Sequence, residues 1–490
     1  MYITLEQGEK IPMGNFSFVG DAAGNRELAE LIFQCEACYL TDYMEFAKKL
    51  RGIIEALAMH EEIRRRKSTP GEKHKSEDVI RQEITEEIRK SARPDSGRGP
   101  GRKNITTYKG MLYAIAVKKP ERFIDMLDRY HFLGIWNVDN GSIVVDGAYD
   151  KKEEQKVLRE SLKSYIYYLY AFGSKAVHGN EETEERFRPT AENCRRIIWS
   201  FHDFLSAFYQ KPHRFQKELL PVQDYIPVPM DICEKMGFDL GEQKRLYVKE
   251  QRYYILSKEN TVISLHQKRE ADAIHMLWEQ SYEDPANVIR SMEKISCSDK
   301  VSDYQVLSLP GRPISLTPRF IKGLSEQEKL NLIQGVIRGV RSMHTCEPPV
   351  YHRNLNPGEF LVVQINGRYK ILLSGFSYSK KDAEDSDQKT VYYNLIKKAG
   401  DSWSNDYFAP ELRKNDADRK QIRWDAADIF SLGQLMIFIL TGYVAETVQD
   451  VPALLRRTGL KGRKSGVLAD MLSWYPEDRP NIKKVADTYL

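Results

Sequence analysis

The sequence predicts two domains of different fold class, an all-α helical bundle followed by an α+β domain. The chain has 490 residues, which is too long for one ordinary hydrophobic core. Apolar residues recur at helical spacing up to about residue 210, whereas short strand-like segments begin near residue 243 and helices dominate after 324. The expected parts are an N-terminal arm (1–25), a helical domain (26–215) with an insertion (67–107), a linker (216–242) and two lobes (243–323 and 324–490).

Composition and charge narrow the class of protein. Hydrophobic residues make up 41% and charged residues 29%, as in soluble globular proteins. The 74 basic and 70 acidic side chains nearly balance, so charge alone does not indicate a nucleic-acid or membrane partner. The longest apolar run, 429–440, is too short to span a bilayer, and the N-terminus lacks the layout of a signal peptide. We therefore expect a cytoplasmic protein without a membrane partner.

The six cysteines do not predict a disulfide scaffold or a metal site. Cys35 and Cys38 form a C-x-x-C pair inside an expected helix, but a zinc site would need a second pair at similar spacing. We expect reduced, structural thiols, with a redox or metal role as the alternative.

The helical domain is expected to contain several long helices joined by polar segments. Within the insertion, 91–103 is rich in Gly, Pro and basic residues, which favours a flexible loop, with phosphate contact as the alternative. A short hairpin is expected around 139–141. The expected helical ranges are 26–66 with a break near 41–42, 77–91, 108–135, 152–178 and 189–210.

The α+β domain is expected to open with consecutive strands. Residues 245–249 and 252–256 have the composition of strands, as have 261–265, with a turn at 258–260 before the last. Helical periodicity takes over after residue 324.

Residues 351–361 read Tyr-His-Arg-Asn-Leu-Asn-Pro-Gly-Glu-Phe-Leu. This stretch resembles the catalytic loop of protein kinases, in which His-Arg-Asp is followed five positions later by Asn. Further kinase landmarks follow in family order: Ser374-Gly375-Phe376 in place of Asp-Phe-Gly, Ala409-Pro410-Glu411, the segment 428–433 that resembles the helix with a buried Asp (Asp428), and Asp478-Arg479-Pro480. The resemblance covers about 243–490 and implies a two-lobed kinase-like fold.

The residues that maintain a kinase fold match the family. The resemblance implies a buried ion pair between Glu411 and Arg479. It also implies that Asp428 accepts backbone hydrogen bonds from the turn at His352 and Arg353.

The residues that perform kinase chemistry do not match. An amide stands in place of the catalytic base, and a hydroxyl stands in place of the metal-binding Asp. Five positions depart from the family: His266 for the phosphate-binding Lys, Asn354 for the base, Asn356 for the Lys that follows it, Glu359 for the metal-binding Asn, and Ser374 for the Asp of Asp-Phe-Gly. The resemblance therefore implies a pseudokinase without a cofactor, with weak binding of ATP and magnesium through Glu359 as the alternative. The helix carboxylate that would pair with the Lys is either Glu270 or Glu279.

Two segments of the helical domain resemble HEPN-type domains. They are 46–57, with Arg51 and Glu55, and 171–179, with Gly173 and His178. Relatives of this type occur in type I restriction subunits and other prokaryotic defence proteins, and some cleave RNA with an Arg and a His. Here no Arg precedes His178 at the usual spacing, and Arg51 with Glu55 is more simply a structural ion pair.

The leading hypothesis is a regulatory or scaffold protein that joins a HEPN-like module to a pseudokinase, in prokaryotic antiviral defence, with protein partners. One alternative is an RNA-cleaving effector that uses His178, with Arg51 as a further candidate, under control of the kinase-like domain. Another is a divergent ATP-dependent protein kinase. The aromatic cluster Tyr165, Tyr167, Tyr168 and Tyr170 belongs either to the core or to a homodimer interface.

Overall fold

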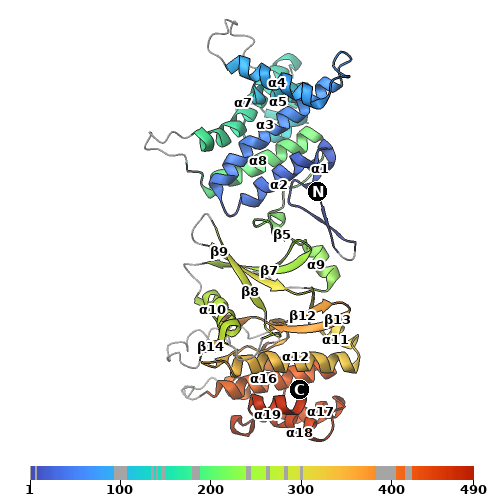
Figure 1. Ribbon diagram of the computed structural model, residues 1–490, viewed down its shortest axis with the longest axis vertical. Helices are drawn as coiled ribbons and strands as arrows, with labels where there is room; N and C mark the ends of the chain where they lie inside the picture. The colour runs from blue at the N-terminus through green and yellow to red at the C-terminus, as the bar shows by residue number, and fades with distance from the viewer. Residues whose placement is uncertain are drawn as a thin grey trace. The chain divides into compact units, whose positions relative to one another are not determined.

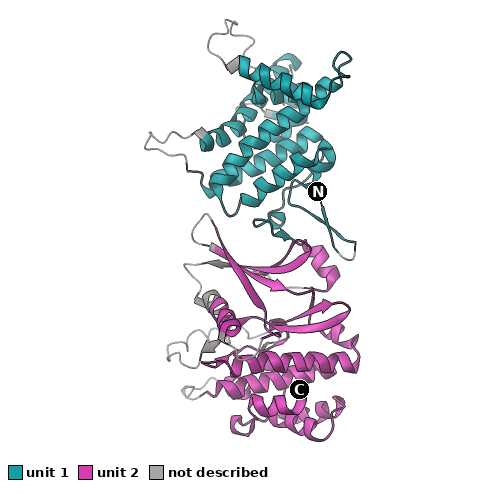
Figure 2. Cartoon of the chain, in the orientation of Figure 1, with its two compact units in different colours: residues 1–227 teal, residues 228–490 magenta. Residues whose placement is uncertain are grey.

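The computed structural model describes the chain except residues 1, 6–7, 93–106, 134–136, 140–141, 145–149, 179–187, 239–243, 261–264, 281–284, 298–301, 382–403 and 414–421. It forms two compact units, Met1–Pro227 and Val228–Leu490 (Figure 2). Unit 1 is mainly helical, whereas unit 2 combines antiparallel sheets with helices, in agreement with an α part and an α+β part.

Unit 1 contains eight α-helices among its described residues, together with two short hairpins (Figure 1). Its elements are β1 (Tyr2–Thr4), β2 (Lys10–Pro12), α1 (Ser17–Ala23), α2 (Arg26–Cys38), α3 (Tyr43–Lys67), α4 (Glu77–Ala92), α5 (Tyr108–Ala116), η1 (Pro120–Phe123), α6 (Ile124–Arg129), β3 (Asn137–Asp139), β4 (Ser142–Val144), α7 (Lys151–His178), α8 (Ala191–Tyr209), η2 (Lys217–Leu219) and β5 (Ile226–Pro227). The helices predicted at 26–66, 77–91, 152–178 and 189–210 are confirmed, including the break near 41–42. The prediction of continuous helix over 108–135 is wrong, because Pro120 begins a 3-10 turn between α5 and α6.

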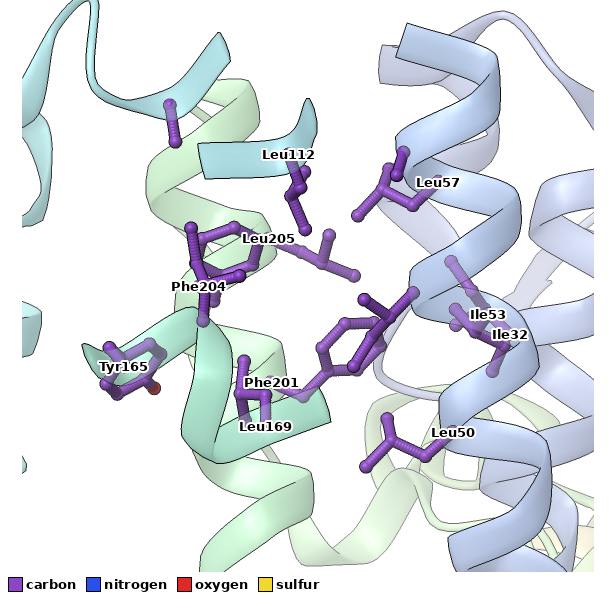
Figure 3. Close-up of a cluster of buried hydrophobic side chains, with 14 of the residues drawn as sticks. Ile32, Leu50, Ile53, Leu57, Leu112, Tyr165, Leu169, Phe201, Phe204 and Leu205 are labelled. Carbon is purple, nitrogen blue, oxygen red and sulfur yellow. The ribbon is translucent and has the colours of Figure 1, made fainter. Parts of the chain in front are cut away.

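Helix α3 lies at the centre of unit 1. Its side chains Leu50, Ile53 and Leu57 are buried at a spacing of three and four, which places them on one helix face. This face packs into a core shared with α2, α5, α7 and α8 (Figure 3). The helix starts where the sequence breaks, since the Asp42 side chain accepts a hydrogen bond from the N–H of Glu45 at 2.9 Å.

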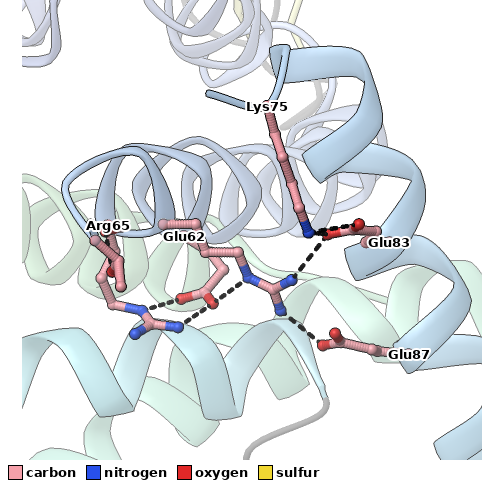
Figure 4. Close-up of polar contacts among 7 residues, drawn as sticks. Glu62, Arg65, Lys75, Glu83 and Glu87 are labelled. Atoms are coloured by element: carbon pink, nitrogen blue, oxygen red, sulfur yellow. Dashed lines mark hydrogen bonds and ion pairs between the residues drawn. The ribbon is translucent and has the colours of Figure 1, made fainter. Parts of the chain in front are cut away.

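The insertion at 67–107 is only partly a loop, because α4 is docked on α3. Its Ile80 and Ile84 are fully buried. The Arg66 guanidinium at the end of α3 contacts Glu62 at 3.0 Å and Glu87 of α4 at 2.7 Å, within the network in Figure 4. The basic run 64–67 is therefore partly neutralised by glutamates within the unit, although most of the predicted Gly-rich loop lies outside the described residues.

The N-terminal residues do not form a separate arm, because residues 14–18 pack against α2 and against residues 213–216 of unit 1. Asn15 donates from its backbone N–H (2.9 Å) and its amide (2.8 Å) to the buried carboxylate of Glu36. The Asn15 side-chain oxygen in turn accepts from the N–H of Gln216 at 2.6 Å. Next to it, the ring of His213 stacks on Phe18. We call residues 14–18 with 213–216 the N-terminal clasp.

Unit 2 begins with a sheet in which four strands follow the order β6-β7-β9-β8. Its elements are α9 (Met230–Met236), β6 (Lys244–Lys249), β7 (Arg252–Asn260), α10 (Leu265–Gln280), β8 (Arg290–Ser296), β9 (Ser302–Leu309), β10 (Arg312–Ser315), α11 (Pro318–Lys322), α12 (Glu326–His344), β11 (Val350–Tyr351), η3 (Pro357–Glu359), β12 (Phe360–Ile365), β13 (Arg368–Leu373), η4 (Phe376–Tyr378), β14 (Lys380–Lys381), α14 (Ser404–Tyr407), α15 (Pro410–Arg413), α16 (Trp424–Thr441), η7 (Val448–Asp450), α17 (Val451–Arg457), α18 (Gly462–Met471), η8 (Pro476–Asp478) and α19 (Ile482–Tyr489).

The predicted order of strands is wrong in its last part. The expected turn at 258–260 belongs to β7, because these residues continue to pair with 302–304 of β9. The expected strand at 261–265 is also wrong where it is described, since Leu265 already begins α10. The remainder, 261–264, lies outside the described residues.

Helix α16 forms the centre of the helical part of unit 2. It has the length and apolar composition of a membrane span, yet 83% of it is buried inside the unit. Among the described residues it is the one helix with this composition. It packs against α12, α17 and α18, as the core helix of a globular domain does.

Candidate functional site

Asp428 of α16 holds the loop that resembles the kinase catalytic loop. Its carboxylate, 1% exposed, accepts hydrogen bonds from the backbone N–H groups of His352 (2.7 Å) and Arg353 (2.8 Å). Arg353 has φ of +66°, a conformation that non-glycine residues rarely adopt, so the turn depends on contacts that hold it in place. The hydrogen bonds that the resemblance implies for Asp428 are therefore present.

His352 links this loop to the segment that follows strand β13. Its Nε2 lies 2.8 Å from the carbonyl oxygen of Ser374, just after β13, and its ring packs against Phe376. Burial lowers the pKa of His352, so the ring is neutral at physiological pH. A neutral, fully buried imidazole with a backbone partner positions the loop and is not placed to exchange protons with a substrate.

Glu411 and Arg479 form the ion pair that the resemblance implies. The guanidinium donates to both carboxylate oxygens, at 2.7 and 2.8 Å. The same guanidinium donates to backbone carbonyls at Ser473 and Ala426. This set of bonds satisfies a charge whose side chain is 0% exposed, and it ties α15 to the segment before α19.

The degenerate positions of the loop bond to one another. The Asn354 amide donates to Glu359 Oε1 at 2.7 Å. Asn356 donates to the backbone and side-chain oxygens of Asn354, at 3.0 and 3.2 Å, and its own side-chain oxygen accepts from the N–H of Gly358. Asn354 therefore contributes hydrogen bonds within the loop, and an amide cannot accept a substrate proton as a carboxylate does.

The Glu359 carboxylate lies against the backbone of Gly375, the glycine after Ser374. A Cβ at Gly375 would collide with it, so this approach requires glycine, whose φ is +71°. Ser374 donates from its hydroxyl (3.0 Å) and its N–H (2.8 Å) to the Glu359 carbonyl. Burial raises the pKa of Glu359 to about 7, against the opposing effect of Lys244. Glu359 thus exchanges a proton near neutral pH.

The cation of the site is Lys244 on β6. Its Nζ lies 2.9 Å from Glu270 on α10, whose carboxylate also accepts from Ser377 at 3.1 Å. Burial disfavours the charged amine, but the carboxylates of Glu270 and Glu359 outweigh this effect and raise the pKa of Lys244. Lys244 therefore remains charged between two acidic side chains.

The prediction that His266 stands in the phosphate-binding position is wrong. His266 lies on the first turn of α10 and not on a strand. In the antiparallel pair of β6 and β7, Lys244 of β6 lies opposite Ser257 of β7. The amine that contacts Glu270 of α10 therefore comes from β6. Of the two candidate helix carboxylates, Glu270 is the partner, whereas Glu279 contacts His275. Sequence reasoning missed Lys244 because its role depends on a contact with Glu270, 26 residues further along the chain.

Asn354, Asn356 and Glu359 bond to one another, and positions 354 and 374 carry no carboxylate. Among the described residues no cluster of three or more His, Cys, Asp or Glu side chains could hold a metal ion. Cys35 and Cys38 belong to unit 1, outside this site. Burial raises the pKa of both thiols above the ordinary value, which disfavours the thiolate that binds metals. What the site can offer chemically is one buried amine, Lys244, and one carboxyl that titrates near neutrality, Glu359.

Segments 46–57 on α3 and 171–179, which begins on α7, belong to helices that pack against each other in unit 1. A Cβ at Gly173 of α7 would come within 2.8 Å of the backbone of Ala47 and Arg51 on α3, so the glycine permits close packing. Arg51 contacts Glu55 at 2.9 Å, and Tyr170 donates to the same carboxylate at 2.8 Å. His178 is the last residue of α7, and its proposed use in RNA cleavage stays a prediction.

The aromatic cluster of α7 divides between core and surface. Tyr165 is fully buried and donates to the carbonyl of Ser200 at 2.7 Å, whereas Tyr168 is 38% exposed. Tyr167 and Tyr170 are half-buried, and Lys109 lies over both rings. A homodimer through this face stays a prediction.

Comparison with known proteins connects this geometry to kinases. The chain is 28% identical over 166 residues to CBL-interacting serine/threonine-protein kinase 24 of Arabidopsis thaliana. The match covers 31% of this chain and 33% of the relative, so the chain spans about a third of that protein. No family model matches the chain. The match supports a kinase-like fold.

Proposed function

We propose that the chain is a pseudokinase-type regulatory or scaffold protein in which unit 2 binds partners and does not transfer phosphate. The observation that carries this proposal is the hydrogen-bonded chain Asn356–Asn354–Glu359. A kinase needs a free carboxylate as base and a second one for magnesium, and their effects on rate are not independent. The fold-maintaining contacts of Asp428 and Arg479 are present, so loss of chemistry does not require loss of the fold.

In this proposal unit 1 is a HEPN-like module that unit 2 regulates, in prokaryotic antiviral defence. Its support is the resemblance of two segments together with the close packing of α3 and α7 at Gly173. A protein partner is expected, because a regulatory fold without chemistry acts by binding.

A phosphotransfer assay on the full chain tests the main proposal. We expect no transfer of labelled γ-phosphate to the chain itself or to a generic protein substrate, with either magnesium or manganese. The matched control is Lys244→Met, which removes the amine of the site. Transfer that is present in the parent chain and lost in Lys244→Met would overturn the proposal.

A second candidate, a divergent ATP-dependent kinase, is favoured by one specific observation. The ion pair between Lys244 and Glu270 retains an amine beside a helix carboxylate, the arrangement that kinases use to hold phosphates. Thermal stabilisation by ATP separates the two candidates further, because a ligand at 100 times its Kd adds about 2.7 kcal/mol. Absence of stabilisation by ATP and magnesium removes the divergent kinase, whereas stabilisation that vanishes in Glu359→Gln shows nucleotide binding and leaves the phosphotransfer assay to decide.

A further inference from the structure

Positive charge is concentrated at the junction of α17 and α18. Residues 451–469 contain five Arg and Lys residues and no Asp or Glu, although the whole chain has 74 basic and 70 acidic side chains. All five are exposed. They are Arg456, Arg457, Lys461, Arg463 and Lys464, which we call the basic junction.

The basic junction is not neutralised by neighbouring carboxylates. None of its members forms an ion pair with the residues that the structure describes, whereas nearby Lys484 contacts Asp470 at 3.4 Å. The Arg457 guanidinium instead lies 5.5 Å from the ring centre of Tyr443, which is 60% exposed. The charge therefore faces solvent, where it can attract an anionic partner over several ångströms.

The first turn of helix α18 lacks the residues that usually stabilise a helix N-terminus. Lys461 at the N-cap makes no side-chain cap, the first turn holds no acidic residue, and Arg463 and Lys464 lie in that turn. Cations near the positive end of a helix dipole cost about 0.3–1 kcal/mol each. By contrast, α12 in the same unit has a complete capping box between Ser325 and Glu328.

The surface of the junction is open to approach. Gly459 and Gly462 both have positive φ, and a Cβ at either would meet nothing within 4 Å. An anionic group at this place would accept hydrogen bonds from the uncapped N–H groups of α18 and would neutralise the cations of its first turn. Cations at an uncapped helix start lower local stability, and proteins retain such unfavourable features mainly at functional sites.

We propose that the basic junction is a docking surface for an acidic peptide segment of a partner protein, with clustered carboxylates or phosphate groups. This inference rests on the proposed binding role of unit 2 and gives its partner a chemistry. A short peptide fits better than a nucleic acid because the five cations lie within residues 456–464, at the junction of two helices. Nucleic-acid surfaces usually present cations and stacking aromatic rings along an extended track.

Fluorescence anisotropy of the full chain tests the docking surface. The probes are a labelled Glu/Ser peptide, the same peptide with phosphoserine, a neutral Gln/Ser peptide and a single-stranded RNA oligonucleotide. The test variant R463E/K464E places acidic residues in the first turn of α18, where they stabilise the helix, so lost binding would not reflect unfolding. The matched control K118E/K119E makes the same charge change at two exposed lysines of unit 1.

We expect at least one acidic peptide to bind the parent chain and K118E/K119E, with about tenfold or greater weakening in R463E/K464E. Comparison of the two acidic peptides identifies phosphate or carboxylate as the preferred anion. Three results would overturn the inference: no binding of either acidic peptide, equal weakening in both variants, or binding of RNA in preference to the peptides. A negative result here leaves the phosphotransfer assay unaffected, so the two proposals fail separately.

Discussion

Replacement of Lys244 by methionine tests whether this lysine is the cation of the buried site. Its side chain is 23% exposed, whereas that of its partner Glu270 is 1% exposed. Removal of one member of a buried ion pair costs about 3–5 kcal/mol, because the other charge is left unpaired. Since Lys244 keeps some contact with water, we expect Lys244→Met to lower the free energy of unfolding of unit 2 by about 2–4 kcal/mol.

Thermal unfolding of the full chain measures this loss. Each kcal/mol shifts the midpoint by roughly 2–4 °C in a unit of this size, so the transition of unit 2 should fall by roughly 4–16 °C. The double variant Lys244→Met/Glu270→Met is the matched control. It replaces the pair by apolar side chains and should recover most of the stability.

A third variant, His266→Ala, tests the competing assignment. If His266 rather than Lys244 balanced the buried carboxylates, the large loss would follow His266→Ala. The reasoning is refuted if Lys244→Met costs less than about 1 kcal/mol, or if the double variant is no more stable than the single one.

Three further predictions concern the rest of the chain. Burial raises the pKa of Glu36 to about 8, so the folded state retains a proton that the unfolded chain releases above pH 4.5. Stability of unit 1 should therefore fall as pH rises from about 4.5 to 8, and denaturation at several pH values should find this slope lost in Glu36→Gln. Arg479→Met should destabilise unit 2 by about 2–4 kcal/mol in guanidinium denaturation, and Glu411→Met in the same chain should restore much of it. Gly173→Ala should lower the melting temperature of unit 1 through a clash worth about 1–3 kcal/mol. The control Gly52→Ala, where a Cβ meets nothing within 4 Å, should leave the temperature unchanged or raise it.

The sequence predicts those features that depend on local spacing or on matched landmarks. The buried face of α3 follows from apolar residues at three and four, and its start follows from Asp42. The contacts of Asp428 and the pair of Glu411 with Arg479 follow from the kinase resemblance. In each case a local pattern or a pair of matched landmarks suffices for the prediction.

The features that sequence reasoning missed depend on pairing between distant segments. Lys244 on β6 contacts Glu270 on α10, which lies 26 residues further along the chain, and no local pattern predicts this contact. The run before His266 has the composition of a strand, yet α10 begins at Leu265. Likewise, Arg66 is neutralised in part by Glu87, which lies 21 residues further along the chain.

The N-terminal clasp has a consequence for the synthesis of the protein. Asn15 bonds to Gln216 across a separation of 201 residues, so this contact cannot form until nearly all of the rest of unit 1 has been translated. At about 5–20 residues per second, roughly 10–40 s separate the synthesis of Asn15 from that of Gln216. During this interval the growing chain exposes the apolar surface that Phe18 later shares with His213, and that surface is where a chaperone would act.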